Sequence, residues 1–403
     1  GKFRHDPAQC AVALCPVHAR HRHVEHHRID RERIRTQAFH CIDAIDGHGD
    51  AMAGALEHAR DRRTHEWLVV HQEDAVDDPV VDEQALDAFD RAVAALPGGG
   101  LAVTRHEPLG PLTTYRVGGA AARFVAVADH DRLVALAGAL AIAPLPVLVV
   151  GRGSNLLVAD AGFPGLALQL GPAFAAVDVG PVVDGWATVR AGGAALLPVV
   201  ARRTAAAGLT GFEWAVGVPG SVGGAVRMNA GGHGSDLASS LVGVRVVDLR
   251  LGEDGEVTPT ALELGYRSSA IAPHQVVSWA ELRLAAGDRE AAEAELAEIV
   301  RWRREHQPGG PNAGSVFTNP PGDSAGRLID AAGCKGLRVG SAEVSTKHAN
   351  FIQADPGGSA DDVLALMHEV RHRVAATSGV VLHAETCCVG FTTAQLHPDR
   401  STP

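Results

Sequence analysis

The chain has almost no lysine: of its 36 basic residues only Lys2, Lys335 and Lys347 are lysines, a bias expected of a GC-rich genome. It also lacks any apolar run near the roughly 18 residues that a membrane-spanning helix needs. No segment combines an apolar core with a cleavage site, so the sequence predicts no secretory signal. The net charge of −11 argues against a general nucleic-acid binder. We therefore expect no membrane and no nucleic-acid partner.

The six cysteines lack the C-x-x-C spacing of zinc or redox sites. Cys387 and Cys388 are adjacent, so on a strand their side chains would point to opposite faces. This usage predicts free thiols in a reducing cytoplasm. In the body of the chain no cluster of histidine, cysteine or carboxylate has metal-ligand spacing, and no metal site is predicted.

The first 75 residues differ from the rest, because they hold eleven of the 21 histidines and three of the six cysteines. Their apolar residues follow neither a helical nor a strand period. The histidines at positions 21–27 could bind a metal, or the segment could be poorly ordered or not native coding sequence. We expect residues 1–78 to be an extension of this kind and place no function there.

From about residue 81 the pattern becomes regular and predicts an α+β protein, long enough for two or three domains. Asp82 can cap a helix with apolar residues at 86, 89, 93 and 96. The other expected helices cover 129–140, 196–207 and 286–306. The expected strands cover 124–127, 147–150, several segments within 166–190, 241–250, 275–284 and 380–390.

Two glycine loops are the most informative feature of the chain. The first, Gly151-Arg152-Gly153-Ser154-Asn155, lies between two apolar runs, and the second reads Gly-Val-Pro-Gly-Ser-Val-Gly-Gly at 217–224. Glycines let backbone N–H groups approach a polyanion closely. Neither loop is a Rossmann fingerprint or a P-loop. The pair suggests an extended diphosphate cofactor that is held at two places.

Three residues outside the loops could carry chemistry. Arg267 follows Tyr266 between strands, Ser315 follows a glycine at the start of an apolar strand, and Glu385 lies in a mostly apolar strand. A buried carboxylate is costly unless it is paired or functional. Each residue also has a structural interpretation: a surface arginine, a turn serine and a glutamate on a wet strand face. Ser315 lacks the G-x-S-x-G context of a hydrolase.

Taken in order, these segments resemble the UDP-N-acetylenolpyruvoylglucosamine reductase family over roughly residues 83–392. The matching motifs are Thr-Thr-Tyr-Arg-Val-Gly-Gly at 113–119, the two glycine loops, Met-Asn-Ala-Gly at 228–231, Gly-Tyr-Arg-Ser-Ser at 265–269, Ala-Gly-Ser-Val-Phe at 313–317, Ser-Thr-Lys-His-Ala-Asn at 345–350 and Leu382-x-x-Glu385.

The resemblance implies an FAD-binding domain of the vanillyl-alcohol oxidase / p-cresol methylhydroxylase type plus a smaller α/β substrate-binding domain. The implied boundaries are 79–150 for the first FAD subdomain, completed by 380–395, then 151–306 for the second and 307–379 for the substrate domain. The implied activity is reduction of UDP-N-acetylglucosamine enolpyruvate to UDP-N-acetylmuramate, for peptidoglycan. NADPH is the implied hydride donor, non-covalent FAD the cofactor, and a cytoplasmic monomer the expected form.

The resemblance also assigns residues. Arg267, Ser315 and Glu385 match the catalytic residues: a cation for the enolate, a proton donor, and a partner of the arginine. Tyr266, Lys347 and His348 are the expected substrate contacts. The expected cofactor contacts are Arg116, Gly151, Arg152, Gly153, Ser154, Asn155, Leu156, Gly217, Pro219, Gly220, Ser221, Gly223, Gly224, Asn229 and Gly231.

The chain departs from the family pattern at two positions, since His306 and Thr318 stand where lysine is frequent. The interval from Arg267 to Ser315 has room for little more than one strand and one helix, which indicates the family's shorter form. Two alternatives stay open at this point. One is another flavin oxidase of the same fold, acting for example on sugar lactones, and the other is a binding protein without catalysis.

Overall fold

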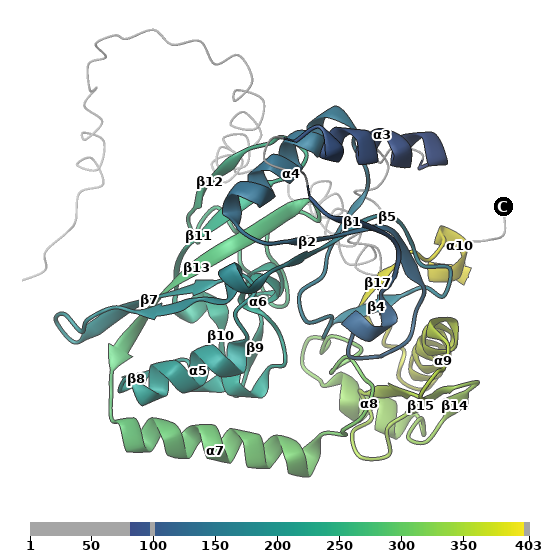
Figure 1. Cartoon of the computed structure of the whole chain (residues 1–403). Coiled ribbons are helices and arrows are strands. Elements are labelled where there is room, and N and C mark those ends of the chain that lie inside the picture. The colour runs from purple at the N-terminus through teal and green to yellow at the C-terminus, as the bar shows by residue number, and fades with distance from the viewer. Residues whose placement is uncertain (1–80, 97–100, 399–403) are drawn as a thin grey trace, which may run out of the picture. The chain divides into compact units, whose positions relative to one another are not determined.

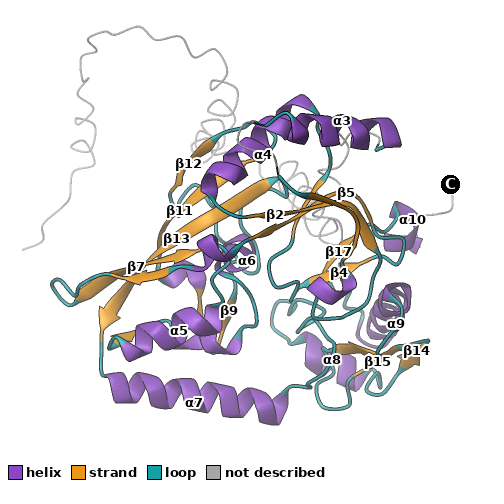
Figure 2. Cartoon of the chain, viewed as in Figure 1, coloured by secondary structure: helices purple, strands orange, loops and turns teal. Residues whose placement is uncertain are grey.

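The computed structural model describes residues 81–96 and 101–398. The expected extension, its histidine tract and the first three cysteines lie outside these residues. Helices and strands are mixed along the described chain, which agrees with the α+β prediction (Figures 1 and 2). Four groups of buried apolar side chains form the cores, and three of them are large.

The first sheet has the strand order β1-β2-β5-β3. Strand β1 runs antiparallel to β2, whereas β5 is parallel to both β2 and β3. Helices α3 and α4 pack together beside this sheet (Figure 1). The bounds are α3 Glu83–Ala94, β1 Val103–Pro108, β2 Ala120–Val127, α4 His130–Ile142, β3 Val147–Val149 and β5 Phe163–Leu170.

Aspartates begin both helices, as the sequence predicts for α3. The side chain of Asp82 accepts a hydrogen bond from the backbone N–H of Ala85 at 2.8 Å, and Asp129 accepts one from Arg132 at 2.9 Å. Each satisfies a backbone donor that the first helical turn leaves unpaired. Arg123 of β2 is fully buried, and its Nε donates to Asp90 of α3 at 2.8 Å. This paired charge fixes the helix to the sheet.

The second sheet is antiparallel, with the order β12-β11-β13-β7-β6, and β8 pairs with β13. Helices α5 and α7 pack against each other and belong to its core (Figure 1). The bounds are β6 Val177–Val179, β7 Trp186–Gly192, α5 Leu197–Ala206, β8 Leu209–Thr210, α6 Val222–Met228, β9 Gly231–Gly232, β10 Ser235–Asp236, β11 Leu241–Asp248, β12 Asp254–Val257, β13 Gln275–Ala286 and α7 Arg289–His306.

Between Arg267 and Ser315 the regular elements are β13 and α7, the strand and helix that the shorter form implies. The strand is two residues longer than expected and the helix begins three residues later. Asp288 explains the second difference, because its side chain accepts a hydrogen bond from the N–H of Ala291 at 2.7 Å and thereby starts the helix there.

The C-terminal part has a three-stranded antiparallel sheet, β14-β15-β16, against which α8 and α9 pack. Its core includes Tyr115, Val117 and Leu157 from the N-terminal part of the fold. The bounds are α8 Ala325–Ala331, β14 Arg338–Val339, β15 Ala342–Val344, β16 Ile352–Ala354, α9 Ala360–Ser378 and α10 Thr393–Leu396.

The prediction of one long last strand at 380–390 is wrong. Only β17, Cys387–Val389, is a strand, and it pairs in parallel with β4, Leu156–Val158, which follows the first glycine loop. The preceding residues instead make single hydrogen bonds to the segment that carries Ser315. The N–H of Glu385 donates to the carbonyl of Val316 at 2.7 Å. Glu385 therefore lies on a loop, not within a strand.

Candidate active site

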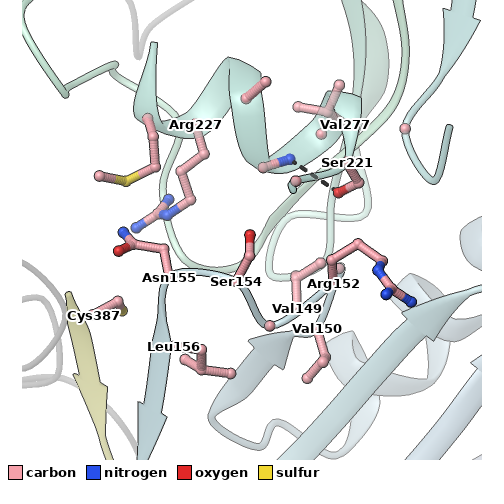
Figure 3. A pocket seen from close by; sticks show the side chains of 18 of the residues that line it. Val149, Val150, Arg152, Ser154, Asn155, Leu156, Ser221, Arg227, Val277 and Cys387 are labelled. Carbon is pink, nitrogen blue, oxygen red and sulfur yellow. Dashed lines mark hydrogen bonds between the residues drawn. The ribbon is translucent and has the colours of Figure 1, made fainter. Parts of the chain in front are cut away.

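A cleft of about 1300 Å³ runs past both glycine loops. Figure 3 shows the first loop with Ser154 and Asn155, and Ser221 of the second loop on the other side. The lining also includes all three residues expected to be catalytic: Arg267, Ser315 and Glu385. Segments that are far apart in the sequence thus meet in one cleft.

The first loop connects β3 to β4 and needs glycine at position 153. Gly153 has a φ of +58°, and an added Cβ would lie 2.4 Å from the carbonyl oxygen of Leu112. Its own carbonyl accepts a hydrogen bond from the N–H of Thr114 at 3.1 Å. On one side of the loop, neighbouring backbone leaves no room for a side chain at position 153. The other side of the loop is open to the cleft.

The second loop ends at Ser221, which caps α6 by accepting a hydrogen bond from the N–H of Gly224 at 3.5 Å. The two loops are in contact, since a Cβ on Gly151 would come within 2.6 Å of the Ser221 hydroxyl oxygen. Where they meet, this close pair of loops presents backbone groups at its glycines together with the hydroxyls of Ser154 and Ser221. Such a cradle fits an extended diphosphate, and the residues present are compatible with FAD.

The charged side chains along the cleft are almost all positive. Among the described residues that line it, Glu385 is the one carboxylate, against five arginines: Arg152, Arg227, Arg250, Arg267 and Arg303. The whole chain carries a net charge of −11, so the cleft is a cationic site on an acidic protein. Focused positive charge of this kind favours polyanionic ligands.

Three of these arginines were missed by the sequence analysis. Arg227 lies in the last turn of α6 and points into the cleft beside Asn155 (Figure 3). Its guanidinium also donates to the carbonyl of Ile271. Its position between the second loop and the Met-Asn-Ala-Gly motif is a signal that could have identified it. Arg250 and Arg303 lie outside every motif, so no sequence signal points to them.

Arg267 and Glu385 form an ion pair within the cleft. The Nε of Arg267 donates to Glu385 Oε1 at 2.8 Å, and a second guanidinium nitrogen donates to the carbonyl of Gly231 at 3.0 Å. The two side chains are only 22% and 16% exposed. Burial raises the pKa of the Glu385 carboxyl, although Arg267 opposes that shift. Burial thus favours a proton on Glu385 beside a fixed cation.

The backbone around Glu385 is held from two sides. Its N–H donates to Val316, directly after Ser315, and its carbonyl accepts a hydrogen bond from the Asn155 side chain at 2.8 Å. Asn155 belongs to the first glycine loop. One hydrogen bond therefore connects the predicted cofactor loop to the predicted catalytic carboxylate.

Ser315 is positioned by its neighbours on both sides. Gly314 has a φ of +77°, and its N–H donates to the Asn312 side chain at 3.0 Å. On the other side, the Asn350 amide makes two hydrogen bonds to the backbone of Phe317, at 3.0 Å and 2.8 Å. These contacts fix the segment and leave the serine in the cleft lining.

Five expected contacts do not line the cleft in this structure: Arg116, Asn229, Tyr266, Lys347 and His348. Asn229, in a left-handed conformation after α6, bonds instead to Asp236, the carbonyl of Gly265 and the N–H of Ala238. The twelve expected loop positions between 151 and 224 all line the cleft, and so does Gly231.

The other four residues have different surroundings. Tyr266 is 59% exposed, with the Arg267 guanidinium 5.3 Å from its ring centre. The Arg116 guanidinium donates to the carbonyl of Pro111 at 3.4 Å. Lys347 donates to the carbonyl of Arg304 at 2.6 Å. Burial, with Lys335 nearby, lowers the pKa of His348.

The described residues contain neither a cluster of metal ligands nor a membrane-spanning helix. No group of three or more histidines, cysteines or carboxylates there could hold a metal ion. No helix in the same part of the chain is both long and apolar enough to cross a bilayer.

Comparison with known proteins identifies the family. Residues 121–257 match the FAD binding domain family, and residues 306–389 match the C-terminal domain of UDP-N-acetylenolpyruvoylglucosamine reductase. The reductase of that name from Paramagnetospirillum magneticum is 43% identical over 70% of this chain and 91% of its own length. UDP-N-acetylenolpyruvoylglucosamine reductase 2 from Symbiobacterium thermophilum is 44% identical, with the same coverage.

A solved structure agrees with the sequence matches. The crystal structure of UDP-N-acetylenolpyruvylglucosamine reductase from Thermus caldophilus superposes with a TM-score of 0.62 at 36% identity, over 72% of this chain and 99% of that one. The predicted FAD-binding α+β fold is thereby confirmed. On this identity and coverage, the chain belongs to the UDP-N-acetylenolpyruvoylglucosamine reductase family.

Proposed function

We propose that the protein reduces UDP-N-acetylglucosamine enolpyruvate to UDP-N-acetylmuramate with NADPH and bound FAD, in the synthesis of peptidoglycan precursors. The observation that carries this proposal is the meeting of the Arg267–Glu385 ion pair and Ser315 with both glycine loops in one cleft. The family relationship supports the reaction. When bound, FAD supplies the carrier that passes hydride from NADPH to the vinyl carbon of the substrate.

The cofactor is held by backbone more than by side chains. The loops at 151–156 and 217–224 would take its diphosphate, with Ser154, Asn155 and Ser221 as additional polar contacts. Arg152 and Arg227 add positive charge on opposite sides of the first loop (Figure 3). The expected contacts Arg116 and Asn229 remain part of this proposal as cofactor contacts, although they lie outside the lining.

Arg267 binds the substrate carboxylate. When hydride adds to the vinyl carbon, negative charge grows on the neighbouring carbon and spreads into that carboxylate. A guanidinium that is already fixed by Glu385 and the Gly231 carbonyl needs no reorganisation to stabilise this charge. The fork geometry of arginine suits a carboxylate better than a lysine ammonium would.

Ser315 delivers the proton that completes the reduction at this carbon. A serine hydroxyl is a poor acid in water, so its placement beside a developing carbanion must supply the drive. Glu385 acts with Arg267 on the same intermediate. Because burial raises its pKa, it can donate a hydrogen bond to the enolate in its protonated form. Tyr266, Lys347 and His348 are proposed to contact the substrate.

Two half-reactions test this proposal under anaerobic conditions. NADPH should bleach the flavin absorbance, and the enolpyruvyl substrate should restore it, with a product heavier by two hydrogens in mass spectrometry. A colourless protein that takes up no added FAD would end the proposal. Reduction of the flavin by a sugar lactone rather than NADPH would support the oxidase alternative, and reduction by neither would support a binding protein.

The domain boundaries, the oligomeric state and the cellular location are also proposals. We infer FAD subdomains at 79–150, completed by 380–395, and at 151–306, with a substrate domain at 307–379. The family matches to 121–257 and 306–389 support these divisions. A monomer is also proposed, and size-exclusion chromatography with light scattering would test it. The free thiols of Cys334, Cys387 and Cys388 favour the cytoplasm.

A further inference from the structure

The Ser315 hydroxyl makes no hydrogen bond to another group among residues 81–96 and 101–398. Arg267 and Glu385, which line the same cleft, are hydrogen-bonded to each other instead. The place of the hydroxyl is therefore set by the backbone that carries it. A proton donor must lie within hydrogen-bond reach of the atom that it protonates, so a small shift of this backbone matters.

One residue holds that backbone through three hydrogen bonds. Asn350 lies between β15 and β16 and is 4% exposed. Its amide oxygen accepts from the N–H of Phe317 at 3.0 Å, and its amide nitrogen donates to the carbonyl of the same residue at 2.8 Å. Its own carbonyl accepts from the N–H of Val316 at 2.9 Å. Asn350 thus fixes the two residues that follow Ser315.

The same segment also contacts the loop of Glu385. The carbonyl of Val316 accepts hydrogen bonds from the N–H of Glu385 at 2.7 Å and from that of Thr386 at 3.3 Å. The segment therefore lies between Asn350 and the Glu385 loop, like a strand with a neighbour on each side. Without the Asn350 side chain it would keep the Glu385 contacts alone, and the backbone that carries Ser315 would be free to shift.

The loop that carries Asn350 is closed on itself. The N–H of Ser345 donates to the carbonyl of Phe351 at 2.8 Å, and the Ser345 hydroxyl accepts from the N–H of Lys347 at 3.1 Å. The N–H of Asn350 donates to His348 Nδ1 at 3.3 Å. Asn350 is thus a fixed point and not a group that follows the serine. Catalytic geometry within about 0.5 Å depends on supports of this kind.

The carbon that receives the proton makes the position of the serine consequential. Once hydride has added to the vinyl carbon, the neighbouring carbon of the enolate is planar and has two open faces. The Ser315 hydroxyl gives its proton to that carbon and regains one from water, so one hydride and one proton have been added across the double bond. Protonation on one face gives one configuration of the new centre, and protonation on the other gives its epimer.

We propose that Asn350 is a positioning residue, which keeps the Ser315 hydroxyl on one face of the substrate and thereby sets the configuration at the protonated carbon. This inference rests on the proposed function. Asn350 does not line the cleft, so it acts through the backbone of Val316 and Phe317 and not by contact with the substrate.

The test uses full-length holoenzyme with the substitution Asn350→Leu, which keeps a similar volume but removes both side-chain hydrogen bonds. Reoxidation of the flavin by the enolpyruvyl substrate should slow about 10- to 100-fold, because a displacement of about 1 Å can cost a factor of about 10². Reduction by NADPH should keep the parent rate. NMR of the product should show both configurations at the new centre, whereas the parent enzyme gives one.

A double-mutant cycle shows whether Asn350 acts through the serine. Ser315→Ala removes the donor, so adding Asn350→Leu to it should slow reoxidation no further, whereas a merely structural role would give an additive loss. Ser341→Ala is the matched control. The Ser341 hydroxyl donates to Asp362 and accepts from the N–H of Ser359, in the same part of the fold but outside the cleft lining. This control should lower the melting temperature and leave reoxidation and product unchanged.

A second variant covers the case in which Asn350→Leu does not fold, as judged by FAD content and melting temperature. Asn350→Asp keeps the acceptor for the N–H of Phe317 and loses the donor. Its rate of reoxidation and its product ratio should fall between those of the parent and Asn350→Leu, and it decides by the same criteria.

The inference is overturned if the folded variant gives a single configuration, or if its loss of rate adds to that of Ser315→Ala. It is also overturned if reduction by NADPH slows as much as reoxidation. Failure of the proposed function would look different, because the parent enzyme itself would not be reoxidised by the enolpyruvyl substrate. The positioning role would fall with it.

Discussion

The two halves of the cleft are built in different ways. The loop half consists of two short continuous segments, 151–156 and 217–224, and acts mainly through backbone groups. The other half, which we propose to be catalytic and call the catalytic half, consists of single side chains from segments far apart in the sequence: Arg267, Ser315 and Glu385. The loop half depends on glycines, because a side chain at these positions would block the close approach of the backbone. The second depends on long-range hydrogen bonds that bring three side chains together.

This difference predicts different responses to substitution. A change in the loop half should alter cofactor binding, and through it both half-reactions. A change in the catalytic half should spare the reduction of the flavin by NADPH and slow only its reoxidation by substrate. Asn155 belongs to both halves, because it lies in the first loop and its side chain donates to the carbonyl of Glu385.

The largest expected effect is that of Ser315→Ala. If Ser315 delivers the proton, reoxidation of the flavin by the enolpyruvyl substrate should slow about 10²- to 10⁴-fold, the usual contribution of general acid catalysis. Reduction by NADPH should stay near the rate of the parent enzyme. Stopped-flow absorbance of the flavin follows both steps, and Ser239→Ala, at an exposed serine outside the cleft, is the control. Equal slowing of both steps would contradict the assigned role.

Gly153→Ala tests the loop half and should have the next largest effect. The new Cβ would meet the backbone of Leu112 at 2.4 Å, and the φ of +58° is unfavourable for alanine. We expect the free energy of unfolding to fall by about 2 kcal/mol or more and FAD to be lost on purification. Denaturant unfolding and the flavin spectrum measure the two effects.

A matched glycine provides the control for that substitution. Gly138 lies within α4, and an added Cβ there would meet nothing within 4 Å. Gly138→Ala should therefore keep FAD and gain up to about 1 kcal/mol of stability, because alanine favours helix. If both variants kept FAD equally well, the loop would not depend on its shape as we infer.

Asn155→Ala should separate the two halves by a smaller effect. Losing its hydrogen bond to Glu385 should slow reoxidation of the flavin by the substrate about 5-fold, because one hydrogen bond contributes about 1 kcal/mol. The slowing should persist when FAD is saturating, because the effect acts on the position of Glu385. Asn319→Ala removes a hydrogen bond outside the cleft and is the control. Full recovery with added FAD would place Asn155 in the loop half alone.

The sequence predicts the loop half well and the catalytic half less well. Glycines at fixed spacing between apolar runs are a local signal, and aspartates such as Asp82 mark helix starts directly. The segment at 380–390 is mostly apolar, which is typical of a buried strand, yet its residues 383–386 make only single hydrogen bonds to Val316 and Thr318 and form no continuous strand pairing. Such pairing is long-range and has no local signature. Arg303 was missed for a related reason, since the direction of a side chain on a charged helix depends on packing.

The smallest expected effect concerns Glu385 and the pH dependence of stability. Burial raises its pKa in the folded protein above that of the unfolded chain. The folded state therefore holds this proton at pH values where the unfolded state has released it. The stabilising contribution of the protonated group is complete below the unfolded value of about 4.3 and is lost as the pH rises through the folded pKa.

Glu385→Gln tests this sign, because the amide stays neutral at every pH. With excess FAD present, the parent protein should lose stability relative to Glu385→Gln as the pH rises from about 4.3, as measured by denaturant unfolding at a series of pH values. Glu290→Gln, at an exposed position of α7, controls for the loss of one negative charge. An opposite slope, with the parent gaining stability over the variant as the pH rises, would mean that the ion pair with Arg267 outweighs burial. The carboxylate would then act in its charged form, and the hydrogen bond to the enolate would have to come from Ser315 alone.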